Sequence, residues 1–328
     1  MCGIVTAIAT HNIVPFLLEG LKRLEYRGYD SAGLAVPGAH KKERGEPELV
    51  RLRACGRVSE LAALVEARQL SSPVGVAHTR WATHGVPSER NAHPHVSGNV
   101  AVVHNGIIEN FETLKTDLQA RGYVFVSDTD TEAIAHLIHC KLQTTPDLLE
   151  AVRLTVNELE GAYALGVISA SDPERVIVAR CGAPLLLGIG TEGLYAASDT
   201  AALLPVTRKV VYLEDGDLAE LTRDSYRVVC ADGSTAERAV HVSSLTADAV
   251  ELGLYRHFMQ KEIFEQPQAL TNTLGLVIGC RTVSAEHFGE RAKEIFADVR
   301  RVQILACGTS YHAGLVARYW LEALAGLP

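Results

Sequence analysis

The sequence predicts an α+β protein in which two packed sheets lie between helices, followed by a smaller α/β unit. Residues 3–9, GIVTAIA, form an unbroken apolar run that is typical of a buried strand. Residues 162–230 consist of short apolar segments separated by turn residues, with few helical patterns. Between these regions the apolar residues recur at helical spacing. This order of strands, helices and strands favours two sheets between helical layers.

The first hundred residues alternate between predicted helices and strands. Residues 13–24 form a helix with Leu17, Leu21 and Leu24 on one face. Residues 57–68 are also helical, whereas residues 74–78 and 99–104 are strands. The charged residues 41–48 contain Gly and Pro, which predicts a loop or hairpin between two of these elements.

The middle of the chain is predicted to be helical. Residues 111–121 form an amphipathic helix that Gly122 ends in the C′ position. A second helix begins near Asp130, where Thr129 and Glu132 have the spacing of a capping box. A third helix begins near Pro146.

The length of 328 residues suits two domains. We expect a first domain over residues 1–240, a linker over 241–250 and a second unit over 251–328. In that unit, residues 255–274 are helical, and residues 301–328 follow the order strand, tight turn, helix. Because one such unit cannot bury both faces of its strand, the second unit is expected to be incomplete.

Composition restricts the class of protein. The chain is 47% hydrophobic and 21% charged with a net charge of −8, which predicts a packed core and argues against a nucleic-acid partner. No apolar run is long enough for a bilayer, and no signal peptide is evident. The scattered cysteines predict a reducing, cytoplasmic setting without disulfides, metal or cofactor. They are Cys2, Cys55, Cys140, Cys181, Cys230, Cys280 and Cys307.

Cys2 directly follows the initiator methionine. Cysteine is small enough for Met1 to be removed by aminopeptidase, which would leave a thiol and an α-amine on one residue. The pKa of an α-amine is about 7.7–8.0, so the amine would be a general base beside a nucleophile. Alternatively, a cysteine at this position has no function.

Polar residues also gather where the predicted strands end. Asn105 and Gly106 follow the strand 99–104 and could donate an amide N–H pair to an oxyanion, or form a common Asn-Gly turn. Arg80 could bind a carboxylate or form a surface ion pair, and Asp130 could bind an ammonium group or cap its helix. His84 and His93 could be catalytic or structural.

Together these segments resemble the class II glutamine amidotransferases, which release ammonia from glutamine. The segments that carry the resemblance are MCGIV, LEYRGYDSAGLAV, HTRWATHG, NAHPH, VHNGIIEN and SDTDTE, in that order. The resemblance implies the N-terminal nucleophile hydrolase fold, a four-layer αββα arrangement with two antiparallel sheets.

The resemblance also implies residue roles. Cys2 is the nucleophile with its amine as base, and Asn105 and Gly106 form the oxyanion hole. Arg80 binds the α-carboxylate of L-glutamine and Asp130 its α-ammonium group. Around this centre, Thr83, His84 and Gly85 line the pocket, Trp81 gates the ammonia passage, and Arg27 lies in a loop near the nucleophile.

Residues 251–328 resemble the start of a sugar isomerase (SIS) half, found in amidotransferases that pass ammonia to fructose 6-phosphate. In the segment ILACGTSYHAG, Thr309 and Ser310 match residues that contact the sugar phosphate. The resemblance implies a homodimer through that half, which continues well beyond Pro328. It also implies glycine where this chain has Thr6, for which we expect a small packing adjustment.

Two other readings remain. An amidotransferase that acts on a phosphoribosyl group, or one like asparagine synthetase, shares MCGI and the Asn-Gly pair, but ILACGTSYHAG fits neither. A binding module that descends from a glutaminase would be favoured by loss of the nucleophile, and Cys2 is present.

Overall fold

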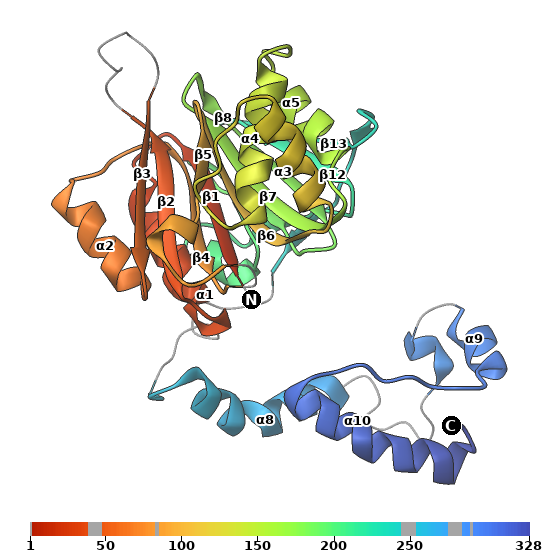
Figure 1. Ribbon diagram of the computed structural model, residues 1–328. Helices are drawn as coiled ribbons and strands as arrows, with labels where there is room; N and C mark the ends of the chain where they lie inside the picture. The colour runs from red at the N-terminus through yellow and green to blue at the C-terminus, as the bar shows by residue number, and fades with distance from the viewer. Residues whose placement is uncertain (1, 39–47, 83–84, 244–253, 275–283, 289–290) are drawn as a thin grey trace. The chain divides into compact units, whose positions relative to one another are not determined.

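A computed structural model describes residues 2–38, 48–82, 85–243, 254–274, 284–288 and 291–328 (Figure 1). The chain separates into two compact units, residues 1–253 and 254–328. Each unit is described separately below. The finer boundaries expected from the sequence, with a linker over 241–250, stay a prediction.

One layer of the first unit is an eight-stranded antiparallel sheet in the order β15-β11-β9-β10-β1-β4-β2-β3. β1 is an inner strand, because it pairs with β4 on one side and with β10 on the other. The run 3–9 is thus confirmed as a buried strand. The strands are β1 (Gly3–Ala9), β2 (Ser31–Pro37), β3 (Leu49–Cys55), β4 (Val74–Arg80), β9 (Leu186–Ile189), β10 (Gly193–Ala197), β11 (Lys209–Tyr212) and β15 (Val240–Val242).

The second layer is a seven-stranded antiparallel sheet in the order β14-β13-β12-β8-β7-β6-β5. Its long central hairpin, β6 with β7, is paired from Val100↔Ser169 to Ile108↔Gly161. The strands are β5 (His95–Ser97), β6 (Val100–Ile108), β7 (Gly161–Ser169), β8 (Asp172–Cys181), β12 (Asp217–Leu221), β13 (Tyr226–Cys230) and β14 (Thr235–Ala236).

Helices cover the outer face of each sheet (Figure 1). The helices α1 and α2 pack on the eight-stranded sheet, and α3, α4 and α5 pack on the seven-stranded sheet. Their bounds are α1 (Val14–Leu24), α2 (Val58–Ala67), α3 (Phe111–Ala120), α4 (Asp130–Leu142), α5 (Leu148–Val156) and the short α6 (Thr200–Leu203), with 3₁₀ turns at Glu25–Arg27 and Glu89–Asn91.

Three apolar cores hold these layers together. One lies between α1, α2 and the first sheet, and a second lies between α3–α5 and the second sheet. The third is formed by the inner faces of both sheets, for example Ile4 and Ile8 of β1 with Val103 of β6 and Ile168 of β7. The expected αββα arrangement is therefore confirmed.

Thr6 illustrates how the two sheets fit together. Its side chain is fully buried. A Cβ atom at Gly166 of β7 would lie only 2.7 Å from the Thr6 methyl group. The missing side chain at Gly166 thus leaves the space that the Thr6 methyl group needs.

Gly122 ends α3 in the predicted C′ position, with φ of 90°. The N–H of Gly122 donates to the Gln119 carbonyl, and the N–H of Tyr123 donates to the Leu118 carbonyl. These two bonds form a Schellman motif, which a residue other than glycine would strain at this φ.

One local prediction is wrong in this unit. Asn105 and Gly106 form no turn and do not follow a strand, because β6 continues through them to Ile108. The polar segment after Cys230 forms short strands. It contains β14 and β15, and β15 pairs with β11.

The second unit consists of helices in its described part. They are α8 (Phe258–Leu274), α9 (Ala292–Asp298) and α10 (Gly308–Trp320), with a 3₁₀ turn at Ala285–Phe288 and a π-helical turn at Leu321–Ala325. The helix expected within 255–274 is confirmed. The strand expected before Gly308 is not formed by residues 301–307, since no described neighbour pairs with them.

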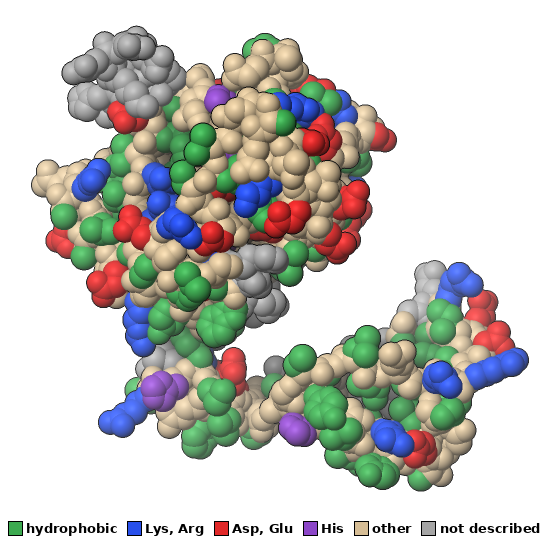
Figure 2. All heavy atoms as spheres, in the orientation of Figure 1, with side chains coloured by type: hydrophobic (Ala, Val, Ile, Leu, Met, Phe, Trp, Pro, Cys, Tyr) green, Lys and Arg blue, Asp and Glu red, His purple; other side chains and the backbone are tan. Residues whose placement is uncertain are grey.

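Within the described residues, no helix combines the length and the hydropathy of a bilayer span. The visible face of the first unit carries acidic and basic side chains of both signs (Figure 2). This mixture agrees with the net charge of −8 spread along the sequence.

Candidate active site

A cavity of about 720 Å³ in the first unit brings together most of the residues singled out from the sequence. It is open to solvent, and its wall comes from the start of β1, the ends of β4 and β6, and the start of α4. The predicted site residues that line it are Cys2, Arg27, Arg80, Trp81, Asn105, Gly106 and Asp130.

Cys2 precedes β1 and is held by the chain segment that follows β4. Its Sγ accepts a hydrogen bond of 3.2 Å from the N–H of Trp81, and Sγ can donate to the Trp81 carbonyl at 3.5 Å. Burial raises the pKa of the Cys2 thiol. This thiol therefore needs a base to become a thiolate near neutral pH.

Asn105 faces Cys2 from the second sheet. Its Nδ2 donates to the Cys2 carbonyl oxygen at 3.2 Å, so one N–H of the amide is engaged while the residue still lines the cavity. The next residue, Gly106, has φ of 137°, and a Cβ atom there would lie 1.9 Å from the Ala162 carbonyl oxygen. Only glycine fits this point of the strand.

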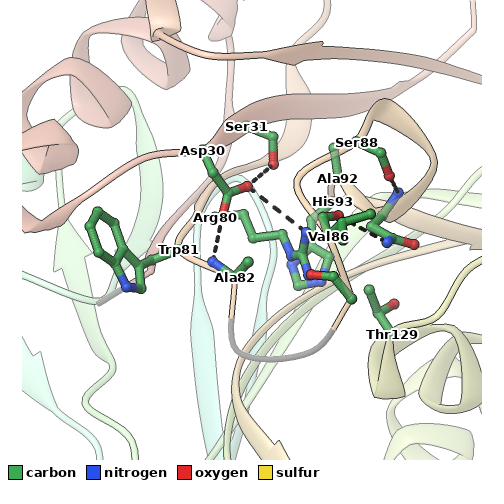
Figure 3. A network of polar contacts seen from close by, with 12 residues as sticks. Asp30, Ser31, Arg80, Trp81, Ala82, Val86, Ser88, Ala92, His93 and Thr129 are labelled. Carbon is green, nitrogen blue, oxygen red and sulfur yellow. Dashed lines mark hydrogen bonds and ion pairs between the residues drawn. The ribbon is translucent and has the colours of Figure 1, made fainter.

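Arg80 is the last residue of β4 and is only 4% exposed. Its Nη2 donates to the Gly85 carbonyl at 3.3 Å, and its Nη1 lies 3.9 Å from Asp30 Oδ1. Asp30 also accepts hydrogen bonds from the backbone N–H of Ala82 and from the Ser31 hydroxyl (Figure 3). The carboxylate thus joins the arginine to the chain segment that runs past Cys2.

Asp30 was missed as a site residue by sequence reasoning, although it lies in the quoted segment LEYRGYDSAGLAV. The available signal was an acidic residue directly before the buried strand β2. A buried arginine needs an anionic partner, and this carboxylate is one.

Asp130 begins α4 and is 6% exposed. Its Oδ2 accepts a hydrogen bond of 2.9 Å from the Ile108 N–H, and its Oδ1 lies 3.8 Å from His104 Nδ1. The carboxylate is therefore fixed at the end of β6 and keeps acceptor capacity toward the cavity.

The predicted capping box at the start of α4 is wrong. Thr129 makes no side-chain cap, and its hydroxyl instead contacts His95 Nε2 at 2.9 Å. Glu132 accepts hydrogen bonds from the N–H groups of Val126 and Ser127 and from the Ser127 hydroxyl. This buried carboxylate therefore binds the loop that precedes the helix, and it does not cap the first turn of the helix.

Trp81 and Arg27 lie at the rim of the cavity. The indole is 54% exposed, and a Cβ atom at Gly28 would lie 2.1 Å from it, so the ring rests on the Gly28 backbone. Arg27 forms an ion pair of 2.7 Å with Asp199, which caps α6.

The remaining predicted residues fall elsewhere. Gly85 is described and contacts Arg80, whereas Thr83 and His84 lie outside the described residues. His93 lines the cavity, and burial holds the pKa of its imidazole well below the ordinary value, which favours a neutral, structural role. Thr309 and Ser310 are exposed in the first turn of α10, in the second unit.

The chain is similar to a known domain family and to curated proteins along its whole length. A family model for the glutamine amidotransferase domain matches residues 78–205. The chain is 55% identical, over its full length, to the glutamine–fructose-6-phosphate aminotransferase (isomerizing) of Vibrio cholerae. It is 54% identical to the protein of the same name from Acidithiobacillus ferridurans. Residues 78–205 belong to the glutamine amidotransferase domain family.

The chain spans about half the length of the curated relatives that it matches, 53% in both cases. Among solved structures it resembles a glutamine phosphoribosylpyrophosphate amidotransferase from B. subtilis, with a TM-score of 0.55 and 24% identity over 75% of this chain and 50% of that one. A structure titled as the allosteric regulatory enzyme of purine biosynthesis gives the same TM-score at 26% identity, with the same coverage. These likenesses support the N-terminal nucleophile hydrolase fold.

Proposed function

We propose that the first unit hydrolyses L-glutamine to glutamate and ammonia, with Cys2 as the nucleophile. The observation that carries this proposal is the position of Cys2 Sγ in a cavity that Asn105, Arg80 and Asp130 also line. Binding and hydrolysis of the side-chain amide of an amino acid require a nucleophile, an amide donor, a cation and a carboxylate.

In the proposed mechanism the α-amine of Cys2, freed by loss of Met1, takes the thiol proton. The thiolate attacks the side-chain carbonyl carbon of glutamine, and the resulting oxyanion is stabilised by the Asn105 side chain and the Gly106 N–H. The tetrahedral intermediate breaks its C–N bond, and ammonia leaves with the proton that the amine held. Water then cleaves the thioester, which releases glutamate and restores the thiol.

Substrate binding uses the two charged groups. Arg80 would contact the α-carboxylate through its planar guanidinium, and Asp130 would accept hydrogen bonds from the α-ammonium group. Both side chains are at least nine-tenths buried and held by other residues, so they are ordered before substrate binds. Gly85, Thr83 and His84 would complete this wall.

We further propose that, in the longer protein, the ammonia is passed to fructose 6-phosphate to give glucosamine 6-phosphate. This proposal rests on the names of the relatives at 54–55% identity. Trp81 and Arg27 at the cavity rim would control the passage, and Thr309 and Ser310 would belong to a sugar-phosphate site that residues beyond the aligned half complete. Dimerisation through that half, and a reducing cytoplasmic setting, belong to the same proposal.

The test is release of glutamate and ammonia by the purified chain. Wild-type protein is expected to hydrolyse glutamine, and Cys2→Ala protein to lose hydrolysis while keeping its thermal transition. A matched control is Cys55→Ala, which removes an exposed thiol that does not line the cavity. Equal activity of wild-type and Cys2→Ala protein would contradict the proposal. In a parallel assay with fructose 6-phosphate, residues 1–328 alone are expected to form no glucosamine 6-phosphate.

A further inference from the structure

His78 lies behind the wall of the candidate active site. It is part of β4, is fully buried and does not line the cavity. Its Nε2 lies 3.0 Å from the His104 carbonyl oxygen and 3.0 Å from Asn105 Oδ1. The imidazole therefore contacts the amide that faces Cys2 without reaching the cavity itself.

The contacts run from the His104 carbonyl through His78 and the Asn105 amide to the Cys2 carbonyl. The two carbonyl groups determine which atoms donate and which accept. The His104 carbonyl can only accept, so Nε2 of His78 carries the hydrogen. The Asn105 atom that faces His78 must then be the oxygen. At the other end, the Cys2 carbonyl can also only accept, and it requires the Asn105 nitrogen at 3.2 Å. Both ends independently give the same orientation of the amide.

Burial keeps the imidazole in this form. It lowers the pKa of His78 to about 3, so the ring is neutral at physiological pH. The Nδ1 atom is buried and has no hydrogen-bond partner among the described residues, so a hydrogen there would be unsatisfied. His93 Nδ1, at 3.1 Å from His78 Nε2, is then left as an acceptor.

We propose that His78 is a positioning residue, which holds the Asn105 amide with its nitrogen toward Cys2 and the cavity. With the amide reversed, its oxygen would face the Cys2 carbonyl and would repel the oxyanion that forms on glutamine. The inference rests on the proposed glutaminase function and adds a residue that acts through Asn105 and does not touch substrate.

The test compares His78→Gln with His78→Asn. A glutamine amide can place an N–H near the position of Nε2, whereas an asparagine amide reaches only the position of Nδ1. We expect His78→Gln to keep kcat within about tenfold of wild type, and His78→Asn to lower kcat on the order of a hundredfold with little change in KM. Thr79→Val, on the same buried strand, is the control and is expected to keep wild-type kcat.

A second measurement separates positioning from folding. Alkylation of Cys2 by iodoacetamide needs no oxyanion hole, so each folded variant should be labelled at the wild-type rate. In an Asn105→Ala background, His78→Asn is expected to cause no further loss of kcat. Equal kcat for the Gln and Asn variants, or a full additional loss in that background, would overturn the inference. An inactive wild-type chain would instead refute the proposed function.

Discussion

The sulfur of Cys2 accepts a hydrogen bond from the backbone N–H of Trp81 at 3.2 Å. The thiol is thereby held against the segment that leaves β4 and leads past Arg80. A backbone donor alone does not offset burial, which raises the pKa of the Cys2 thiol. In the proposed mechanism the thiol loses its proton to the α-amine of the same residue, which is free once Met1 is removed.

Active protein is therefore expected to lack Met1. With Met1 attached, the nitrogen of Cys2 is an amide and cannot take a proton. Intact-mass analysis of active and inactive fractions checks this prediction, because active fractions should begin at Cys2. Full glutaminase activity in protein that retains Met1 would exclude the amine as the base.

Arg80 and Asn105 are expected to give different kinetic defects. Arg80→Lys keeps the charge but loses the planar fork, so the KM for glutamine should rise with a smaller change in kcat. Asn105→Ala removes a donor to the transition state, so kcat should fall on the order of a hundredfold or more. Steady-state kinetics on both variants provide the measurement, and identical patterns would refute this division of roles.

Stability is expected to fall as pH falls below about 6.5. Burial holds the pKa of His78 at about 3 and that of His95 well below its ordinary value, whereas both titrate near 6.5 when unfolded. The unfolded chain then binds more protons than the folded one. The contribution of each histidine to the free energy of unfolding is fully present above pH 6.5. It is lost as the pH falls toward the pKa of the folded state, at up to about 1.4 kcal/mol per pH unit.

Urea unfolding between pH 7.5 and 5.5 measures this effect. His95→Gln removes one of the titrating groups, so its stability should depend less steeply on pH than that of the wild type. Parallel pH dependence of the two proteins would show that His95 does not contribute.

The first unit is expected to be active without the second. Arg208 donates from Nε and Nη2 to the Ser243 carbonyl, at 2.9 and 2.6 Å, which fastens the end of β15. Residues 1–243 should therefore retain the glutaminase activity of the longer chain. Residues 1–239 lack β15 and leave β11 at the sheet edge, which should cost on the order of 2 kcal/mol and lower Tm by about 4–8 °C. Calorimetry and glutamate release check both, and a higher Tm for residues 1–239 would contradict this account.

The sequence predicts the elements whose pattern is local. Gly122 ends α3 as expected, because the C′ position selects glycine through its own backbone angle. The strand Gly3–Ala9 is recovered because every residue in it is buried. The strand predicted for residues 301–307 is not formed. A strand exists only when another chain segment pairs with it, and a local sequence pattern does not show whether such a segment is present.

The sequence predicted most of the polar residues that line the cavity, but not the residues that hold them in place. Asn105 was placed after a strand because Asn-Gly is common in turns, whereas pairing with β7 keeps it inside β6. The contact of His78 with Asn105 joins residues 27 positions apart on different sheets. The spacing of apolar and polar residues along the sequence cannot predict such a contact, because the contact depends on how the two sheets are stacked.

The inner position of β1 has a consequence during synthesis. β1 needs β10, whose residues leave the ribosome about 190 positions later, to complete its pairing. At ordinary rates of about 5–20 residues per second, the first strand waits for about 10–40 s without that neighbour. During this interval β1 has no partner strand on the side that β10 later occupies. Under the proposed mechanism, the order of strands in the sheet leaves time for Met1 to be removed before β10 completes the pairing of β1.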